Sequence, residues 1–409
     1  MARDRILAII QAGGAGGRMD VLTRERAKPA LPFAGIYQLV DFPLSNLAHS
    51  GIRDVWLSVS YLGSTLEDEI SNGRPWDLDR NQGGLRLLMP QEGTGSTDEE
   101  GFARGNADEL YRIRDKIAVA DPEVVVVMSA DHVYRFDYLD AVRTHRDADA
   151  DCTVVTTEVP LDEASDHATV SVDDSGVVVG FAYKPEDPET TTVATEIFLY
   201  SPAVLIETLE QLHRELGPES GPGDSGLGDF GEHLLPRLVD ARRVVAHRLP
   251  GYWKDLGEPH KYLAAHRDLL TDNLGVFADP SWPILTRQTQ RVPARVLDGG
   301  TVTDSLLSPG SRVSGTVLRS VLGPGVVVQA GAVVRDSVVF ADTVVERGAS
   351  IDWAVVDREC VVEADARVGE DHDNEPDDAD AVTLVGMGSR IRSGERVAGG
   401  ARLEPGSSV

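Results

Sequence analysis

The sequence predicts an α/β protein in which a Rossmann-like, mostly parallel sheet is followed by a left-handed parallel β-helix. Up to about residue 265, short apolar runs alternate with helix-like segments. From residue 321 onward, hydrophobic residues recur at every sixth position instead. The chain has 409 residues. A single core usually stops growing at roughly 250–300 residues, so two domains are expected.

The apolar runs of the first part predict strands that are buried on both faces. Each run is nearly continuous in apolar residues, which is typical of a parallel sheet covered by helices on both sides. Helix-like segments separate the runs, and this order favours βαβ connections. The predicted strands are 6–10, 55–60, 124–128, 152–159 and 196–200, and the predicted helices are 44–52, 107–120 and 138–148.

The second part carries a six-residue repeat that matches neither a helix nor a flat strand. One register runs from Val321 to Ile351 and another from Val326 to Val368, with glycines and acidic turn residues between them. This period is typical of a parallel β-helix whose coils each contain three short strands. An unrelated β-sandwich does not account for so regular a spacing. The repeat returns near the end of the chain at Val385, Ile391, Val397, Leu403 and Val409.

An acidic stretch, 369–381, interrupts this repeat. Its composition is that of a solvated loop, so we expect an insertion between two coils. The sequence therefore predicts an α/β domain at 1–270, a linker at 271–300 and a hexapeptide-repeat β-helix domain at 301–409 that includes the insertion.

The charge balance argues against two classes of partner. Lys and Arg total 39 against 67 Asp and Glu, which gives a formal net charge of −28. Such a field repels nucleic acid and anionic membranes, so neither is an expected partner. A small anionic substrate can still bind, because its site needs only a few local cations.

The cysteines and the N-terminal segment favour a cytoplasmic protein. The two cysteines, Cys152 and Cys360, lie too far apart in sequence for a disulfide framework or a zinc motif. The first residues read as a strand and lack the features of a signal peptide. No stretch reaches the roughly 18 apolar residues of a membrane span.

A glycine-rich turn, IIQAGGAGGRM at 9–19, follows the first predicted strand. It lacks the Lys-Ser or Lys-Thr of a P-loop, and the spacing from Gly13 or from Gly14 misses one glycine of the G-x-G-x-x-G dinucleotide fingerprint. Glycines at this point let backbone N–H groups approach phosphate oxygens closely. A glycine-rich βα connection that binds no ligand remains the alternative from this turn alone.

The residues that follow the turn resemble the sugar nucleotidyltransferase signature G-G-x-G-T-R-[LM]…P-L-T…K-P, and most closely that of the ADP-glucose pyrophosphorylase family. Arg18 follows the glycines, and RAKP lies about ten residues further on. The resemblance covers nearly the whole chain, because that family also carries a C-terminal β-helix. Further matching segments occur in the same order at 39–52, 101–110, 128–138, 183–185, 228–239 and 251–262.

The resemblance implies a reaction in which a sugar 1-phosphate oxygen attacks the α-phosphorus of a nucleoside triphosphate and pyrophosphate leaves. ATP and glucose 1-phosphate would then give ADP-glucose, the precursor for glycogen biosynthesis, with Mg²⁺ as cofactor. Such chemistry needs cations and positioned donors more than a covalent intermediate. The implied site comprises catalytic Arg18, Lys28, Asp131 and Lys184; nucleotide-binding Ala12, Gly13, Gly14, Gly16, Gly17, Gln91, Gly105 and Asn106; sugar-phosphate-binding Tyr183, Lys184 and Glu196; and metal-binding Asp131 and Asp255.

Departures from the family pattern cluster in the sugar pocket. Tyr183 stands where the family has the Glu of Glu-Lys-Pro, and Glu196 stands where it has the Gly of S-M-G-I. Residues 167–169 also replace the family's F-G-V. An added carboxylate suits an amino sugar 1-phosphate or a cyclitol phosphate such as valienol 1-phosphate, so a different acceptor is the alternative.

The nucleotide side and the regulation also differ from the family pattern. Ala103, Asn106 and Gly17 replace a Tyr and two Thr residues, which leaves GTP as an alternative to ATP. Glu25 stands in place of a lysine and would repel a phosphorylated activator. We therefore expect allosteric control that is weaker or different.

Two other classes of function are less consistent with the sequence. Hexapeptide acyltransferases use a histidine base on the β-helix, and residues 281–370 contain no histidine. A non-catalytic regulatory subunit tends to lose metal or phosphate residues, whereas all five of the main charged residues are present here. These five residues are Arg18, Lys28, Asp131, Lys184 and Asp255.

The resemblance also implies a homo-oligomer, either a dimer or a tetramer.

Overall fold

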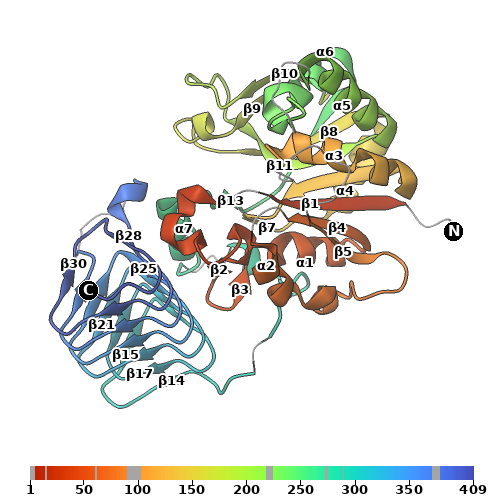
Figure 1. Ribbon diagram of the computed structural model, residues 1–409. Helices are drawn as coiled ribbons and strands as arrows, with labels where there is room; N and C mark the ends of the chain where they lie inside the picture. The colour runs from red at the N-terminus through yellow and green to blue at the C-terminus, as the bar shows by residue number, and fades with distance from the viewer. Residues whose placement is uncertain are drawn as a thin grey trace.

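The computed structural model describes residues 5–13, 16–59, 62–89, 103–217, 224–271, 275–288, 290–370 and 378–409. Its first part is an α/β domain and its second part is a stack of short strands, with helix α7 (Pro259–Asp268) between them (Figure 1). This architecture confirms the predicted fold class. Gly14 and Gln91, which the resemblance assigns to nucleotide binding, lie outside the described residues.

A mixed sheet of nine strands forms the centre of the α/β domain within the described ranges. The parallel neighbours β6, β1, β4 and β5 arise from the near-continuous apolar runs. Strand β11 runs antiparallel to β6 and β8 and connects them. The strands are β1 (Ile6–Ala12), β4 (Asp54–Val59), β5 (Gly84–Leu88), β6 (Val124–Ser129), β8 (Cys152–Glu158), β9 (Ala168–Val172), β10 (Val178–Tyr183), β11 (Thr192–Tyr200) and β12 (Val244–Arg248).

Helices cover both faces of this sheet, which explains why its strands carry so few polar residues. Successive residues of β1 face opposite ways: Ile10 enters one hydrophobic core and Ile9 enters the other. None of the helices in the described ranges has the length and apolar character needed to span a bilayer. The helices are α1 (Asp41–His49), α2 (Gly63–Ile70) and α4 (Tyr138–Asp147) on the first face, α3 (Asn106–Ala120), α5 (Pro202–Leu216) and α6 (Leu235–Ala241) on the second, and α7 at the β-helix.

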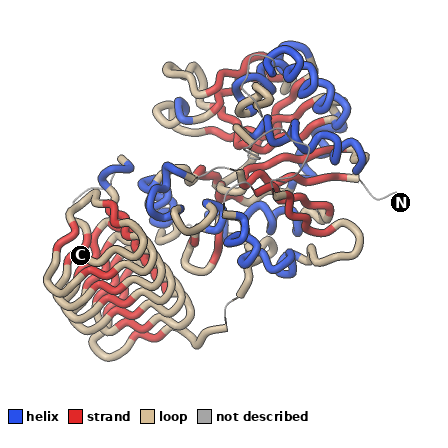
Figure 2. The backbone as a smooth tube through the Cα atoms, in the orientation of Figure 1, coloured by secondary structure: helices blue, strands red, loops and turns tan. Residues whose placement is uncertain are grey.

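Three parallel sheets of two- and three-residue strands form the β-helix, and their strands stack in register (Figure 2). Inward-facing residues such as Val328, Val345 and Val362 lie above one another and fill the core. The strands are β14 (Arg295–Val296), β17 (Arg312–Val313), β20 (Val327–Val328), β23 (Val344–Val345), β26 (Val361–Val362) and β29 (Arg390–Ile391); β15 (Thr301–Thr303), β18 (Thr316–Leu318), β21 (Val333–Arg335), β24 (Ser350–Asp352), β27 (Arg367–Val368) and β30 (Arg396–Val397); and β16 (Leu306–Leu307), β19 (Val321–Leu322), β22 (Val338–Val339), β25 (Ala354–Val356), β28 (Thr383–Val385) and β31 (Arg402–Leu403).

The segment between the two parts is not a free linker in this structure. Trp282 Nε1 donates a hydrogen bond to Asn46 Oδ1 at 2.9 Å, and Leu285 N donates to Ser45 Oγ at 2.8 Å, so the segment packs along α1. Strand β14 lies within the range 271–300, where it pairs with β17 and starts the first coil. The acidic stretch 369–381 falls between β27 and β28, and the described part of it includes a short 3₁₀ turn, Ala379–Ala381.

A buried ion pair joins the β-helix to the α/β domain. Arg26 Nη2 lies 2.7 Å from Asp357 Oδ1, and the two residues are 5% and 1% exposed. Asp357 also accepts a hydrogen bond from the backbone N–H of Arg358. The Arg26 guanidinium also lies 5.7 Å from the centroid of the Phe340 ring, and Phe340 packs edge-on against Tyr262. Because Arg26 lies two residues before Lys28, this contact anchors the segment that carries one of the predicted catalytic cations.

Replacing Asp357 with alanine is therefore expected to destabilise the protein by about 3–5 kcal/mol, because the Arg26 guanidinium would stay buried without its counter-ion. Urea unfolding followed by circular dichroism measures this loss. Glu215→Ala, which removes an exposed ion pair with Arg237, is the control and should change the unfolding midpoint little. Equal effects of the two substitutions would contradict the structural role of the buried pair.

Asp41 at the start of α1 makes stability depend on pH. It is 1% exposed, and burial raises the pKa of its carboxyl from 3.8 to about 7, although hydrogen bonds from Thr286 and the Gln38 backbone oppose this. Because its pKa is higher in the folded state, the folded state binds more protons, and stability falls as pH rises from about 4 to about 7. Asp41→Asn should remove this fall and gain on the order of 2 kcal/mol relative to the wild type at pH 8. Parallel pH profiles of unfolding for both proteins would contradict it.

Candidate active site

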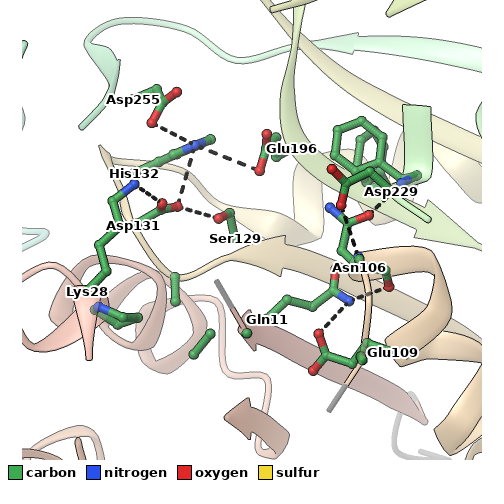
Figure 3. Close-up of a pocket in the computed structure, with 18 of the residues that line it drawn as sticks. Gln11, Lys28, Asn106, Glu109, Ser129, Asp131, His132, Glu196, Asp229 and Asp255 are labelled. Atoms are coloured by element: carbon green, nitrogen blue, oxygen red, sulfur yellow. Dashed lines mark hydrogen bonds and ion pairs between the residues drawn. The ribbon is translucent and has the colours of Figure 1, made fainter. Parts of the chain in front are cut away.

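A cavity of about 400 Å³ opens where the carboxyl ends of β1 and β6 meet (Figure 3). In open α/β sheets, ligands bind in the crevice at this edge of the strands. Of the sequence-predicted site residues, eleven line the cavity, and they come from eight separate segments of the chain. These are Ala12, Gly13, Arg18, Lys28, Gly105, Asn106, Asp131, Tyr183, Lys184, Glu196 and Asp255.

The remaining glycines of the turn have different local roles. Gly16 has a φ of 65°, a left-handed conformation that favours glycine, and a Cβ there would lie 3.1 Å from Lys28 Cβ. Gly17 begins the short 3₁₀ helix Gly17–Thr23, has open space around the position of a Cβ, and does not line the cavity. The structure therefore explains Gly16 by backbone geometry and gives no steric reason for a glycine at position 17.

Asp131 is held by a cation and a hydroxyl at the end of β6. Lys28 Nζ donates to one of its oxygens and Ser129 Oγ donates to the other. Burial opposes ionisation of Asp131, but Lys28 and His132 outweigh it and hold the pKa of this carboxyl well below its usual range. Lys28 is only 8% exposed, and although burial disfavours its charge, the carboxylates of Asp131 and Asp255 raise its pKa. The pair is therefore ionised at neutral pH.

Asp255 reaches the same place through a two-stranded sheet. Strand β13 (Trp253–Asp255) pairs with β7 (His132–Tyr134), and the register sets Asp255 opposite His132. His132 Nε2 lies 3.5 Å from Asp255 Oδ1, 3.6 Å from Asp131 Oδ1 and 3.9 Å from Glu196 Oε2. The three carboxylates raise the pKa of His132 despite its burial. His132 Nδ1 lies 3.1 Å from the carbonyl oxygen of Thr195, which can only accept, so this nitrogen carries a proton.

Glu196 enters the cavity from an irregularity in β11. Its φ is 57°, and the pairing of β11 with β8 shifts register between Ala194 and Phe198. Removal from bulk water is the main cause that raises the pKa of Glu196 to about 7; His132 opposes this and Asp131 adds to it. The carboxylates of Glu196, Asp131 and Asp255 lie around the His132 ring (Figure 3).

A second polar group ties the start of α3 to the segment before Phe230–Leu234. Tyr183 Oη donates to Asp229 Oδ2 at 3.2 Å, and the backbone N–H of Asn106 donates to Asp229 Oδ1 at 3.2 Å. The Asn106 side chain in turn accepts from the backbone N–H of Phe230. Lys184, whose Nζ lies 5.4 Å from the Tyr183 ring centroid, lines the cavity beside this group.

A third group, Gln11 and Glu109, lines the cavity near the first turn of α3. Gln11 Nε2 donates to the carbonyl oxygen of Asn106 at 2.8 Å and to Glu109 Oε2 at 3.2 Å. Burial raises the pKa of Glu109 to about 7, although hydrogen bonds from Ser58 and Gln11 favour its ionised form.

Sequence reasoning missed five polar residues that line the cavity. Each lies within or next to a segment that matches the family signature. Its position beside residues already assigned to the site was the only indication of its role in the sequence. They are Gln11, Glu109, Ser129, His132 and Asp229. Across the described ranges, no group of three or more His, Cys, Asp or Glu side chains could hold a metal ion by itself. Mg²⁺ commonly binds one or two carboxylates and completes its shell with substrate phosphates and water, so Asp131 and Asp255 remain compatible with it.

Comparisons with known proteins match both parts of the chain to described families. Residues 7–272 match a family model described as nucleotidyl transferase, and residues 291–387 match one described as GlmU-like, C-terminal hexapeptide. A glucose-1-phosphate adenylyltransferase of Thermomicrobium roseum is 38% identical over 402 residues, covering 96% of this chain and 91% of that protein. The enzyme of the same name from Clostridium acetobutylicum is 36% identical over 82% of this chain and 86% of its own length. The chain therefore belongs to the nucleotidyl transferase family, as a sugar-1-phosphate nucleotidyltransferase that resembles glucose-1-phosphate adenylyltransferases and carries a hexapeptide-repeat β-helix.

Proposed function

We propose that the protein joins ATP and glucose 1-phosphate to form ADP-glucose and pyrophosphate. The observation that carries this proposal is the meeting of Arg18, Lys28, Lys184 and the carboxylates of Asp131 and Asp255 in one cavity at the strand ends. A polyanionic nucleotide and an anionic acceptor can approach each other there because three cations offset their charges. The names of the relatives support ATP and glucose 1-phosphate as the first choice of substrates.

Asp131 and Asp255 would hold Mg²⁺ in this proposal. Both present hard oxygen donors to one point beside His132, and the pKa of Asp131 is held below its usual range, so at least one of them is ionised at any working pH. When bound, Mg²⁺ supplies charge neutralisation and orientation of the phosphates.

The chain's own residues then position the two substrates. An oxygen of the sugar phosphate attacks the α-phosphorus, the bond to the bridging oxygen breaks, and pyrophosphate leaves with the electron pair. The acceptor phosphate is already an anion, so no general base is needed. Arg18 presents a guanidinium fork to the leaving phosphates, and Lys28 adds a second cation. Lys184 binds the phosphate of the acceptor, with Tyr183 and Glu196 beside the sugar.

The nucleotide would lie along the glycine turn and the start of α3. Backbone N–H groups at Ala12 and Gly13, which line the cavity, supply donors to the phosphates in this proposal. The family resemblance adds Gly14, Gly16 and Gly17 of the same turn. Gly105, Asn106 and Gln91 would contact the nucleoside. Gly14 and Gln91 lie outside the described residues.

Glu196 favours a second candidate function with another acceptor. A carboxylate within 3.9 Å of His132 Nε2, in the cavity where the sugar would bind, suits an ammonium or additional hydroxyl group. We therefore carry the activation of an amino sugar 1-phosphate or a cyclitol phosphate such as valienol 1-phosphate, with ATP or GTP, as the alternative. The regulatory-subunit interpretation is less favoured, because the charged residues of the site are retained.

A pyrophosphate-release screen tests these proposals directly. ATP, GTP, UTP and TTP are combined with glucose 1-phosphate, glucosamine 1-phosphate and valienol 1-phosphate in the presence of Mg²⁺. The highest kcat/KM is expected for ATP with glucose 1-phosphate. A preference for glucosamine 1-phosphate or the cyclitol would replace the first proposal by the second, and no release with any pair would overturn both.

Three further proposals concern the whole protein. We propose a catalytic domain at 1–270, joined by 271–300 to the β-helix domain at 301–409. Both cysteines are free and buried, which suits a reducing compartment such as the cytoplasm. We also propose a homo-oligomer, either a dimer or a tetramer, which analytical ultracentrifugation would test.

A further inference from the structure

The segment that carries Arg18 into the cavity rests on the end of the β-helix. It is the short 3₁₀ helix Gly17–Thr23, and in Figure 1 this red segment lies against the blue last coils. Its apolar side chains are buried in the same cluster as Val382 and Leu384 of the β-helix. These side chains are Met19, Val21 and Leu22. The β-helix therefore supports the backbone from which one of the cations of the site extends.

This backbone is irregular two residues after Arg18. Asp20 has a φ of 50° and a ψ of −127°, a combination that residues other than glycine rarely adopt. Such a conformation persists only where the surrounding contacts fix it. Thr23 Oγ1 donates to the carbonyl oxygen of Asp20 at 3.1 Å, which is one such contact. The Asp20 carboxylate supplies others, and one of them leads directly to the β-helix.

Arg402 of β31 joins the Asp20 carboxylate to the last coil. Its Nε lies 3.4 Å from Asp20 Oδ2. The same guanidinium donates to the carbonyl oxygens of Ala379 at 2.6 Å and Gly400 at 2.8 Å, and also to that of Val382. These hydrogen bonds hold the planar guanidinium in one orientation. Because the Arg402 side chain is only 21% exposed, solvent screens its pairing with Asp20 only in part.

Arg24 and Glu404 form a second connection between the same two segments. Arg24 Nη2 lies 3.2 Å from Asp20 Oδ1, and its Nε lies 3.3 Å from Glu404 Oε2. The Arg24 and Glu404 side chains are 53% and 61% exposed, so this connection is screened by water and contributes little. Of the two connections, the one through Arg402 is the stronger.

The position of the Arg18 guanidinium depends on this backbone. Arg18 lines the cavity, and Gly257 leaves room for it: a Cβ at Gly257 would lie 3.4 Å from Arg18 Nη2 and 3.4 Å from Asp255 Oδ1. Among the residues that the structure describes, none holds the Arg18 side chain by a hydrogen bond or an ion pair. Its reach toward a bound phosphate is therefore set by the segment from which it extends.

We propose that Arg402 is a positioning residue for nucleotidyl transfer. By holding Asp20, it fixes the backbone from which Arg18 reaches the leaving phosphates. This inference rests on the proposed function. A misplacement of about 1 Å can cost on the order of 100-fold in rate, so a residue of the β-helix can affect the reaction without touching either substrate.

A double-mutant cycle with Arg18 tests this role in steady-state assays of pyrophosphate release. Arg402→Met is expected to lower kcat/KM for ATP about 10-fold and to leave the KM for the acceptor unchanged, since Lys184 lies on another segment. In an Arg18→Met background, the same substitution should change kcat/KM for ATP by less than about twofold, because the group that it positions is already absent. Arg402→Lys serves in the same cycle if the methionine variant does not fold.

Two further variants separate positioning from a structural role. Asp20→Gly removes the carboxylate but suits the positive φ of this residue. It should therefore lower kcat/KM for ATP as Arg402→Met does, without lowering the unfolding temperature. Arg396→Met is the matched control, because this exposed arginine lies on β30, immediately before β31 in the last coil. It should retain wild-type kinetics.

An Arg402→Met variant with wild-type kinetics would overturn the inference, and so would an equal loss in the presence and absence of Arg18. Failure of the proposed function is distinguishable from both. If the wild type releases no pyrophosphate with any acceptor, the reaction is refuted and the same cycle is measured on the dissociation constant for ATP by calorimetry. A weakening by Arg402→Met that requires Arg18 then retains the positioning role, and its absence refutes that role as well.

Discussion

Asp131→Asn is expected to lower the rate of pyrophosphate release by at least about 1000-fold, because one of two carboxylates that would hold Mg²⁺ is lost. The substitution also removes the charge that Lys28 Nζ contacts. Pyrophosphate release under saturating ATP and glucose 1-phosphate measures the loss, and thermal unfolding shows whether the variant is folded.

Asp147→Asn provides the matched control, since this exposed carboxylate lies at the end of α4, outside the cavity. It should retain wild-type turnover. A folded Asp131→Asn variant with unchanged turnover would contradict the proposed metal role, whatever the acceptor proves to be.

Lys184→Gln is expected to raise the KM for the sugar 1-phosphate by about 100-fold, with a smaller change in kcat. Its ammonium would contact the acceptor phosphate in both the ground state and the transition state, so the loss falls mainly on binding. The substitution removes the ammonium and leaves a shorter, neutral polar side chain at a position whose φ is 48°. Steady-state kinetics with varied acceptor at saturating ATP measure the effect.

Lys116→Gln, an exposed lysine on α3, is the control for a general change in surface charge. Its KM for the acceptor should equal that of the wild type. If Lys184→Gln instead raised the KM for ATP and left the acceptor KM unchanged, the two substrates would have been assigned to the wrong ends of the cavity.

Hydrophobic periodicity predicted the architecture well, because the spacing of apolar residues along the chain indicates which side chains are buried. The apolar runs became central strands, and the six-residue repeat became the three sheets of the β-helix. The period alone does not set which register faces inward. Val326 and Ala332 are buried, whereas Val327 and Val333, one position further along, are only half-buried. That choice depends on the corners between the short strands.

The site was predicted in part, and the limit is sequence distance. Motif positions identified Asp131 and Asp255, but only the pairing of β13 with β7 sets Asp255 opposite His132. Glu109 and Gln11 are 98 residues apart, and nothing in either neighbourhood indicates that they touch. The Arg26–Asp357 pair spans 331 residues and two domains. Contacts of this kind arise from tertiary packing, which periodicity does not report.

The most direct test of the central claim is product analysis by mass spectrometry after incubation of the wild-type protein with ATP, glucose 1-phosphate and Mg²⁺. The proposed function predicts equal amounts of ADP-glucose and pyrophosphate, and neither product from Asp131→Asn under the same conditions. ATP consumption without a nucleotide–sugar product, or ADP-glucose formed equally by both proteins, would contradict the account.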